Sequence, residues 1–262
     1  MGADVRSIAD NVMQILLLVI SNASKNSTVM EDAFLAVGAL TTATEADFAR
    51  YMESFAPFLL AGLQTYEEHQ MCCIAIGLVG DICRALNEGV VMYCETFVQT
   101  IGTLLQNPQA HRSIKPACLS CIGDIALAIG GKFEVYLHPV MMAIGGLATS
   151  LESVPQATTE QYDYVCQMQE GIAEAYVGIA QGLKAADKGI FLYKTGMLMM
   201  NYAAHIFQFL QFAASIEDRP EFVTRSLVGL VGYLNNHTGT SRTHIRLGSS
   251  SRSSRLNGST RC

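Results

Sequence analysis

Charged residues are scarce in this sequence, and uninterrupted apolar stretches are short. Charged side chains make up 15% of the 262 residues and hydrophobic ones 50%, whereas about a quarter of a typical chain is charged. A membrane-spanning helix needs about 20 apolar residues, but the run 12–20 contains Gln14, and 197–212 contains Asn201 and His205. No basic stretch leads into an apolar run at the start, as a secretory signal requires. The composition therefore favours stacked helices buried on two sides over membrane insertion.

The sequence also lacks any group of residues typical of a catalytic, nucleotide or metal site. Gly77 and Gly80 fall inside a predicted helix, not in a phosphate-binding loop, and Cys118 and Cys121 have no second pair of cysteines near them. The other cysteines lie mostly at apolar helical positions, which is typical of reduced thiols in an intracellular protein. The histidines predicted to lie inside helices are on separate ones, namely His69, His111, His138 and His205. We therefore expect no enzymatic activity, no cofactor and no metal.

What the sequence does contain is a repeat with a period near 40 residues. Glycines in similar apolar surroundings recur in steps of 42, 43, 55 and 54 residues, at Gly38, Gly80, Gly123, Gly178 and Gly232. A second set of markers has steps of 42, 43 and 57 residues, at Tyr51, Tyr93, Tyr136 and Tyr193. Such periods are typical of solenoids built from helical pairs. We therefore predict an all-α fold, a right-handed superhelical α-α solenoid of about five HEAT-type helical pairs.

The repeat divides the chain into a solenoid domain, 1–234, and a tail, 235–262. The predicted units cover about 1–44, 45–88, 89–131, 132–187 and 188–234. The tail is rich in Ser and Arg and has almost no apolar residues. Because it cannot bury enough surface to offset the entropy lost on ordering, we predict that it is disordered. It does not resemble the capping unit that normally ends a solenoid.

The charge is unevenly divided between these two parts. The tail has five Arg and no acidic residue, which leaves 12 basic and 23 acidic residues, a net charge of −11, on residues 1–234. An acidic solenoid favours basic partners and disfavours nucleic acid. Asp81 and Asp124 occupy equivalent positions in successive units. Either each bonds a neighbouring helix or caps a turn, or both belong to an acidic ladder that binds a basic partner.

If the second helix of each unit lines the concave side, further carboxylates extend this ladder. They are Glu67, Glu68, Asp163, Glu170 and Glu174. On the first helices, aromatic residues follow a helical spacing that predicts core packing. An alternative is that clefts between adjacent first helices accept apolar side chains of a peptide. The candidate residues for such clefts are Phe55, Phe58, Tyr93 and Phe97.

Several stretches resemble a known family. Residues 52–59, 77–86, 111–116, 123–131 and 175–184 are similar to the C-terminal half of the importin-β (karyopherin-β) family of HEAT-repeat nuclear import receptors. The similarity extends over about 1–234. After residue 232 the family continues with further helices, whereas this chain continues into the Ser/Arg-rich tail.

The resemblance implies a binding role. In this family the second helices bind the basic N-terminal segment of importin-α or basic cargo segments. Clefts between first helices bind phenylalanine-glycine (FG) nucleoporins, and the GTPase Ran releases the cargo. The repeats that hold the main Ran contacts have no counterpart in this chain. The implied location is the cytoplasm, the nucleus and the nuclear pore. Two alternatives are a HEAT scaffold subunit of a phosphatase-like complex and a truncated isoform that does not transport.

Overall fold

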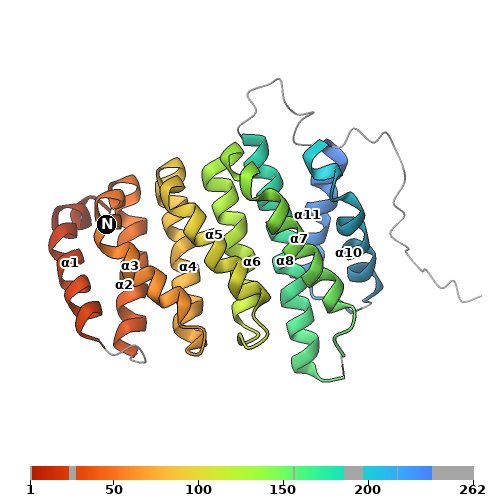
Figure 1. The fold of residues 1–262 in the computed structure, drawn as a ribbon, viewed down its shortest axis with the longest axis horizontal. Helices are drawn as coiled ribbons and strands as arrows, with labels where there is room; N and C mark the ends of the chain where they lie inside the picture. The colour runs from red at the N-terminus through yellow and green to blue at the C-terminus, as the bar shows by residue number, and fades with distance from the viewer. Residues whose placement is uncertain (1, 24–27, 156, 186–196, 217, 238–262) are drawn as a thin grey trace, which may run out of the picture.

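The computed structural model describes residues 2–23, 28–155, 157–185, 197–216 and 218–237, and within them it contains helices and no β-strand. The helices stack side by side in chain order as pairs (Figure 1). The pairs are α1 (Gly2–Asn22) with α2 (Thr28–Thr44), α3 (Met52–Gln64) with α4 (His69–Leu86), α5 (Val91–Gln106) with α6 (Ile114–Ile129), α7 (Glu134–Leu151) with α8 (Thr159–Ala185), and α10 (Ala203–Ser215) with α11 (Glu221–His237). The predicted all-α, HEAT-like solenoid is therefore confirmed.

Short 3-10 helices join one pair to the next. They are η1 (Glu45–Tyr51), η2 (Asn87–Val90) and η3 (Gly130–Phe133), and each begins within two residues of a predicted unit start. Gly130 ends α6 with a φ of 57°, a left-handed conformation that glycine adopts without a steric penalty. The end of α6 and the start of η3 thus coincide at this glycine.

The end of the solenoid differs from the sequence prediction. Helix α11 continues to His237, so the predicted tail begins three residues too early, and the rest of that tail, 238–262, lies outside the described residues. Within the predicted fifth unit, 188–234, a turn at 201–202 precedes α10, which begins at Ala203. The polar Asn201 falls in this turn, and residues 188–196 of this unit lie outside the described residues.

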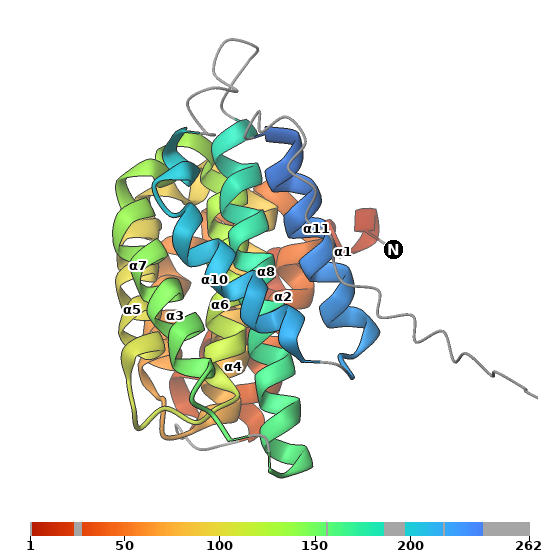
Figure 2. The ribbon, with the colours of Figure 1, turned by 90° about the vertical axis from the view of Figure 1, so that its right-hand side faces the viewer.

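The helices form two layers around one continuous core. The second helices α2, α4, α6, α8 and α11 contact one another in that order, and α3, α5, α7 and α10 do the same in the other layer (Figure 2). Aromatic side chains fill the space between the layers: Phe34 of α2 packs against Phe55 of α3, which also contacts Phe48 of η1. These three side chains are at most 1% exposed. The core packing that the aromatic spacing of the first helices predicts is confirmed for Phe55.

One apolar stretch, Ile114–Leu151, passes a length and composition test for a membrane span, with a mean hydropathy of 1.4. Half of its most apolar 18-residue window is buried inside the solenoid. The 3-10 helix η3 divides the stretch into α6 and α7, which lie in different layers. Core helices of a solenoid pass the same test, so this stretch fits the interior of the stack.

Candidate binding surface on the second helices

The repeated glycines make room for carboxylates of the following unit. A Cβ atom added at Gly38 would lie 3.2 Å from Asp81 Oδ2, and one added at Gly80 would lie 2.5 Å from Asp124 Oδ2. The second contact is too close for any real Cβ atom. The glycine and the aspartate that marked the repeat in the sequence are therefore partners across the boundary between units.

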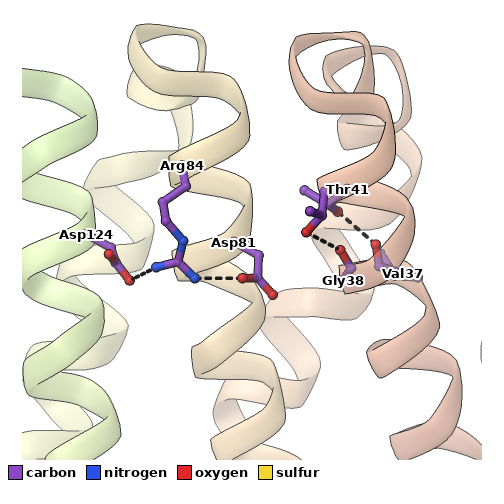
Figure 3. A network of polar contacts seen from close by, with 7 residues as sticks. Val37, Gly38, Thr41, Asp81, Arg84 and Asp124 are labelled. Atoms are coloured by element: carbon purple, nitrogen blue, oxygen red, sulfur yellow. Dashed lines mark hydrogen bonds and ion pairs between the residues drawn. The ribbon is translucent and has the colours of Figure 1, made fainter. Parts of the chain in front are cut away.

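Arg84 joins the two aspartates. Its Nη2 atom donates to Asp81 Oδ1 on the same helix at 2.6 Å, and its Nη1 atom donates to Asp124 Oδ2 on α6 (Figure 3). Asp81 and Arg84 are three residues apart on α4, a spacing at which side chains meet on a helix surface. Asp124 thus bonds a neighbouring helix, as the first of the two sequence interpretations states, whereas Asp81 bonds a residue of its own helix. One positive charge between two negative ones leaves a single net negative charge here.

Two hollows open on the second-helix layer on either side of this bridge. One, of about 300 Å³, lies between α2 and α4 and is lined by Gly38, Ile74 and Asp81 among others. The other, of about 250 Å³, lies between α6, α8 and α11, and Asp124 and Glu174 are among its lining residues. Because Arg84 bonds one carboxylate from each hollow, it lies between them.

Glu174 is a carboxylate at the hollow that Asp124 also lines, and its charge is not compensated by a neighbouring cation. Among the described residues it has no hydrogen-bond or ion-pair partner, and the neighbouring charges that act on it are both negative. Partial burial, followed by the nearby charges of Glu170 and Asp124, raises the pKa of Glu174 above its ordinary value. Glu170 lies one turn earlier on α8, so the two glutamates share a face. A cationic side chain placed here would relieve the repulsion among these carboxylates.

The structure divides the acidic residues expected from the sequence into two groups. Asp81, Asp124, Glu170 and Glu174 lie on the middle and later turns of the second helices, around the two hollows. Of the remaining three, Glu67 and Glu68 directly precede α4, and Asp163 lies in the second turn of α8. Glu68 precedes Asp81 by 13 residues, or roughly 20 Å along a helix. One continuous ladder through all seven residues is therefore not what the structure shows.

The residues expected to line clefts between first helices also divide. Phe55 is 0% and Phe97 1% exposed, so a partner cannot reach them and their expected role in a cleft needs correction: both are core residues. Phe58 is partly exposed and lines a hollow of about 210 Å³ between the first two pairs, and Tyr93 is also partly exposed. Helical spacing alone does not separate the inward from the outward edge of an apolar stripe.

On the first-helix layer, two apolar residues that we did not select from the sequence are far more exposed than Phe58 and Tyr93. Met92 near the start of α5 is 78% exposed, and Val135 near the start of α7 is 75% exposed. They lie 43 residues apart, at equivalent positions of successive units. That spacing is the same signal that identified the repeat, and it could have found them.

The structure brings two histidines together that the sequence analysis treated as separate. The rings of His69 and His111 lie with their centroids 4.1 Å apart, and His111 Nδ1 is 2.8 Å from Ser113 Oγ. His111 precedes α6 and does not belong to it. Within the described part of the chain, no three His, Cys, Asp or Glu side chains are arranged to hold a metal ion. Cys118 and Cys121 are buried free thiols, and burial raises the pKa of both well above the ordinary value.

Comparisons with known proteins show that most of the chain is similar to one family. The family model described as importin subunit beta-1-like, TPR repeats, matches residues 1–244. Importin subunit beta-1 of Schizosaccharomyces pombe is 39% identical over 233 residues, and that of Arabidopsis thaliana 37% over 231. These alignments cover 89% and 88% of this chain but only 26% of each relative. The steps of 42 and 43 residues exceed the 34 of a TPR and are typical of HEAT repeats.

Solved structures agree with the sequence matches. A crystal structure of importin beta in an ammonium sulfate condition superposes with a TM-score of 0.81 at 36% identity, over 89% of this chain and 26% of the other. A complex of Kap95 with Nup1 superposes with a TM-score of 0.75 at 29% identity, over 90% and 26%. The chain therefore belongs to the importin subunit beta-1-like family, and it spans about a quarter of the length of the relatives it matches.

Proposed function

We propose that this chain is a protein-binding segment of a nuclear import receptor. Its second-helix layer would hold a basic helical segment, either the N-terminal segment of importin-α or a basic segment of a cargo. The supporting observation is the uncompensated pair Glu170 and Glu174 beside the hollow that Asp124 lines. Carboxylates that repel one another in the free protein gain most from a cationic ligand.

Salt dependence is the first test of this mechanism. We expect the basic N-terminal segment of importin-α, labelled with fluorescein, to bind the chain with an affinity that falls as NaCl rises from 50 to 500 mM. Salt screens exposed charges beyond about 10 Å at 0.1 M and about 3 Å at 1 M. Fluorescence anisotropy measures the affinity at each concentration. An affinity that does not change with salt would contradict the electrostatic mechanism.

Two double variants test the location. Glu170→Gln with Glu174→Gln should weaken binding by about tenfold, since two exposed charge contacts contribute up to about 1 kcal/mol each. Glu67→Gln with Glu68→Gln removes the same charge near the start of α4, away from the hollows, and serves as the matched control. Equal losses in both variants would show that net charge matters and the site does not.

For other partners of the receptor, the exposed face of the first helices is the candidate surface. One structural relative is a Kap95:Nup1 complex and another is Kap95p bound to RanGDP. We propose that nucleoporin segments contact the face that exposes Met92 and Val135. Ran contacts on this segment would be secondary. The proposed location is the cytoplasm, the nucleus and the nuclear pore.

The rival function in another class is a structural scaffold of a phosphatase-like complex. A scaffold of this kind would bind a phosphatase catalytic subunit and show no preference for basic peptides. A pull-down that compares the two ligands distinguishes these functions. Retention of the catalytic subunit, without retention of the basic peptide, would replace our proposal.

A further inference from the structure

Arg84 occupies a position where a partner's cation would otherwise bind. Its guanidinium lies between the carboxylates of Asp81 and Asp124, one from each hollow, and donates a hydrogen bond to both. The side chain of Asp124 is 19% exposed, whereas that of Arg84 is 57% exposed. The arginine therefore covers the less accessible carboxylate from the solvent side and can move away without disturbing the core.

We infer that Arg84 is an internal competitor for the basic ligand, and that ligand binding displaces it from Asp124. This inference rests on the proposed function. A ligand guanidinium or ammonium in the hollow beside Glu174 also approaches Asp124, because both residues line that hollow. Asp124 accepts the ligand cation when Arg84 turns away, and Arg84 retains Asp81 as its partner. Arg84 thereby lowers the affinity and limits binding to ligands with enough positive charge to compete.

The packing around the bridge supports a replaceable side chain. Asp124 lies beside the backbone of Gly80, where a Cβ atom would collide with its carboxylate. Asp81 lies in the same way beside Gly38, 3.2 Å from the position of a Cβ atom there. The glycines of the preceding units thus leave room for both carboxylates at these positions. The exposed guanidinium between them can therefore exchange for another cation without a change in the packing of the helices.

The test is the affinity of an Arg84→Gln variant for a fluorescein-labelled, 20-residue helical peptide rich in Arg and Lys. Removing the competitor should tighten binding by about threefold to tenfold at 50 mM NaCl and make the affinity depend more steeply on salt. Arg112→Gln is the matched control. Arg112 also bridges two units, through Glu160, and its loss changes the net charge equally, but Arg112 precedes α6 and lines neither hollow. Arg84→Lys should give an intermediate affinity because an ammonium cannot form the two-pronged bridge.

A second measurement uses the unmodified protein. We expect the Nε–Hε NMR signal of Arg84, assigned by its loss in the Arg84→Gln variant, to shift on titration with the peptide. Peptide that binds the unmodified chain but binds Arg84→Gln equally or more weakly, with the Arg84 signal unmoved, would overturn the competition. Peptide that binds neither protein would overturn the proposed function and the competition together. Peptide that binds Arg84→Gln alone would support competition in its strongest form.

Discussion

The crossing of α6 and α8 is a point at which a single methyl group should disturb the solenoid. A Cβ atom at Gly178 would lie 2.7 Å from Gly123 Cα and 3.1 Å from its carbonyl carbon and oxygen. Ordinary contacts between carbon atoms are about 3.5–4.0 Å. Both partners are backbone atoms of helices, so no flexible side chain can move aside. A Gly178→Ala variant must therefore move the two helices apart by roughly 1 Å.

The expected cost follows from two opposing effects. Overpacking a well-packed contact costs about 1–3 kcal/mol, and a clash of backbone with backbone belongs at the upper end. Replacing glycine by alanine inside a helix gains about 1 kcal/mol. We expect a net loss of about 2 kcal/mol in the free energy of unfolding, or roughly 4–8 °C in Tm for a chain of this size.

Urea and thermal unfolding followed by circular dichroism at 222 nm measure this loss. Because units of a solenoid are held together by contacts with their neighbours, the urea transition should also broaden as units four and five separate from the first three. Gly146→Ala is the matched control: nothing lies within 4 Å of an added Cβ atom there, so this variant should be stabilised by up to about 1 kcal/mol. A Gly178→Ala chain as stable as its Gly146→Ala counterpart would refute the close crossing.

Two further predictions concern stability at neutral pH and thiol reactivity. Glu174→Gln should raise the free energy of unfolding at pH 7 by less than about 1 kcal/mol, because the partly buried side chain remains open to solvent that screens its charge, although we expect it to weaken ligand binding when combined with Glu170→Gln. Burial and neighbouring carboxylates raise the pKa of Glu174 in the folded chain, so above that pKa the charged form opposes folding. The stability gained by the Gln variant should therefore vanish below about pH 4, where the carboxyl group is protonated in both the folded and the unfolded chain. Unchanged or lower stability at pH 7 would show that the repulsion is absent. Second, thiol titration of the native protein at pH 8 should modify the partly exposed Cys73 before the buried Cys72. Burial raises the pKa of Cys72 to about 12, so little of it is thiolate at this pH. Cys73→Ser should remove one fast-reacting thiol, and an unchanged fast phase would contradict this.

The repeated glycines acquire a physical meaning that spacing alone does not supply. Gly38 and Gly80 make room for an aspartate of the following unit, whereas Gly123 and Gly178 allow two helix backbones to approach directly. The change follows the sequence, because the residue after Gly178 is Ile179, not aspartate. Ile179 is fully buried. The residue after the repeated glycine is thus polar where α6 packs against α4 and apolar where α8 packs against α6.

The sequence by itself determined the fold class, the length of the repeat and the acidic character of the solenoid. These follow from local properties: helical periodicity, the spacing of Gly and Tyr, and composition. It also separated the first from the second helices well enough to place Asp81, Asp124 and Glu174 on one layer.

Only the tertiary structure decided which carboxylates lack a neighbouring cation and which aromatic side chains are exposed. Arg84 is visible in the sequence three residues after Asp81, but its bond to Asp124 depends on how closely α4 approaches α6. Phe55 and Phe58 belong to one apolar stripe, yet Phe55 is wholly buried and Phe58 lines a hollow. Periodicity reports which face of a helix is apolar. The distance and angle at which the next unit packs against that face decide which residues of it are covered.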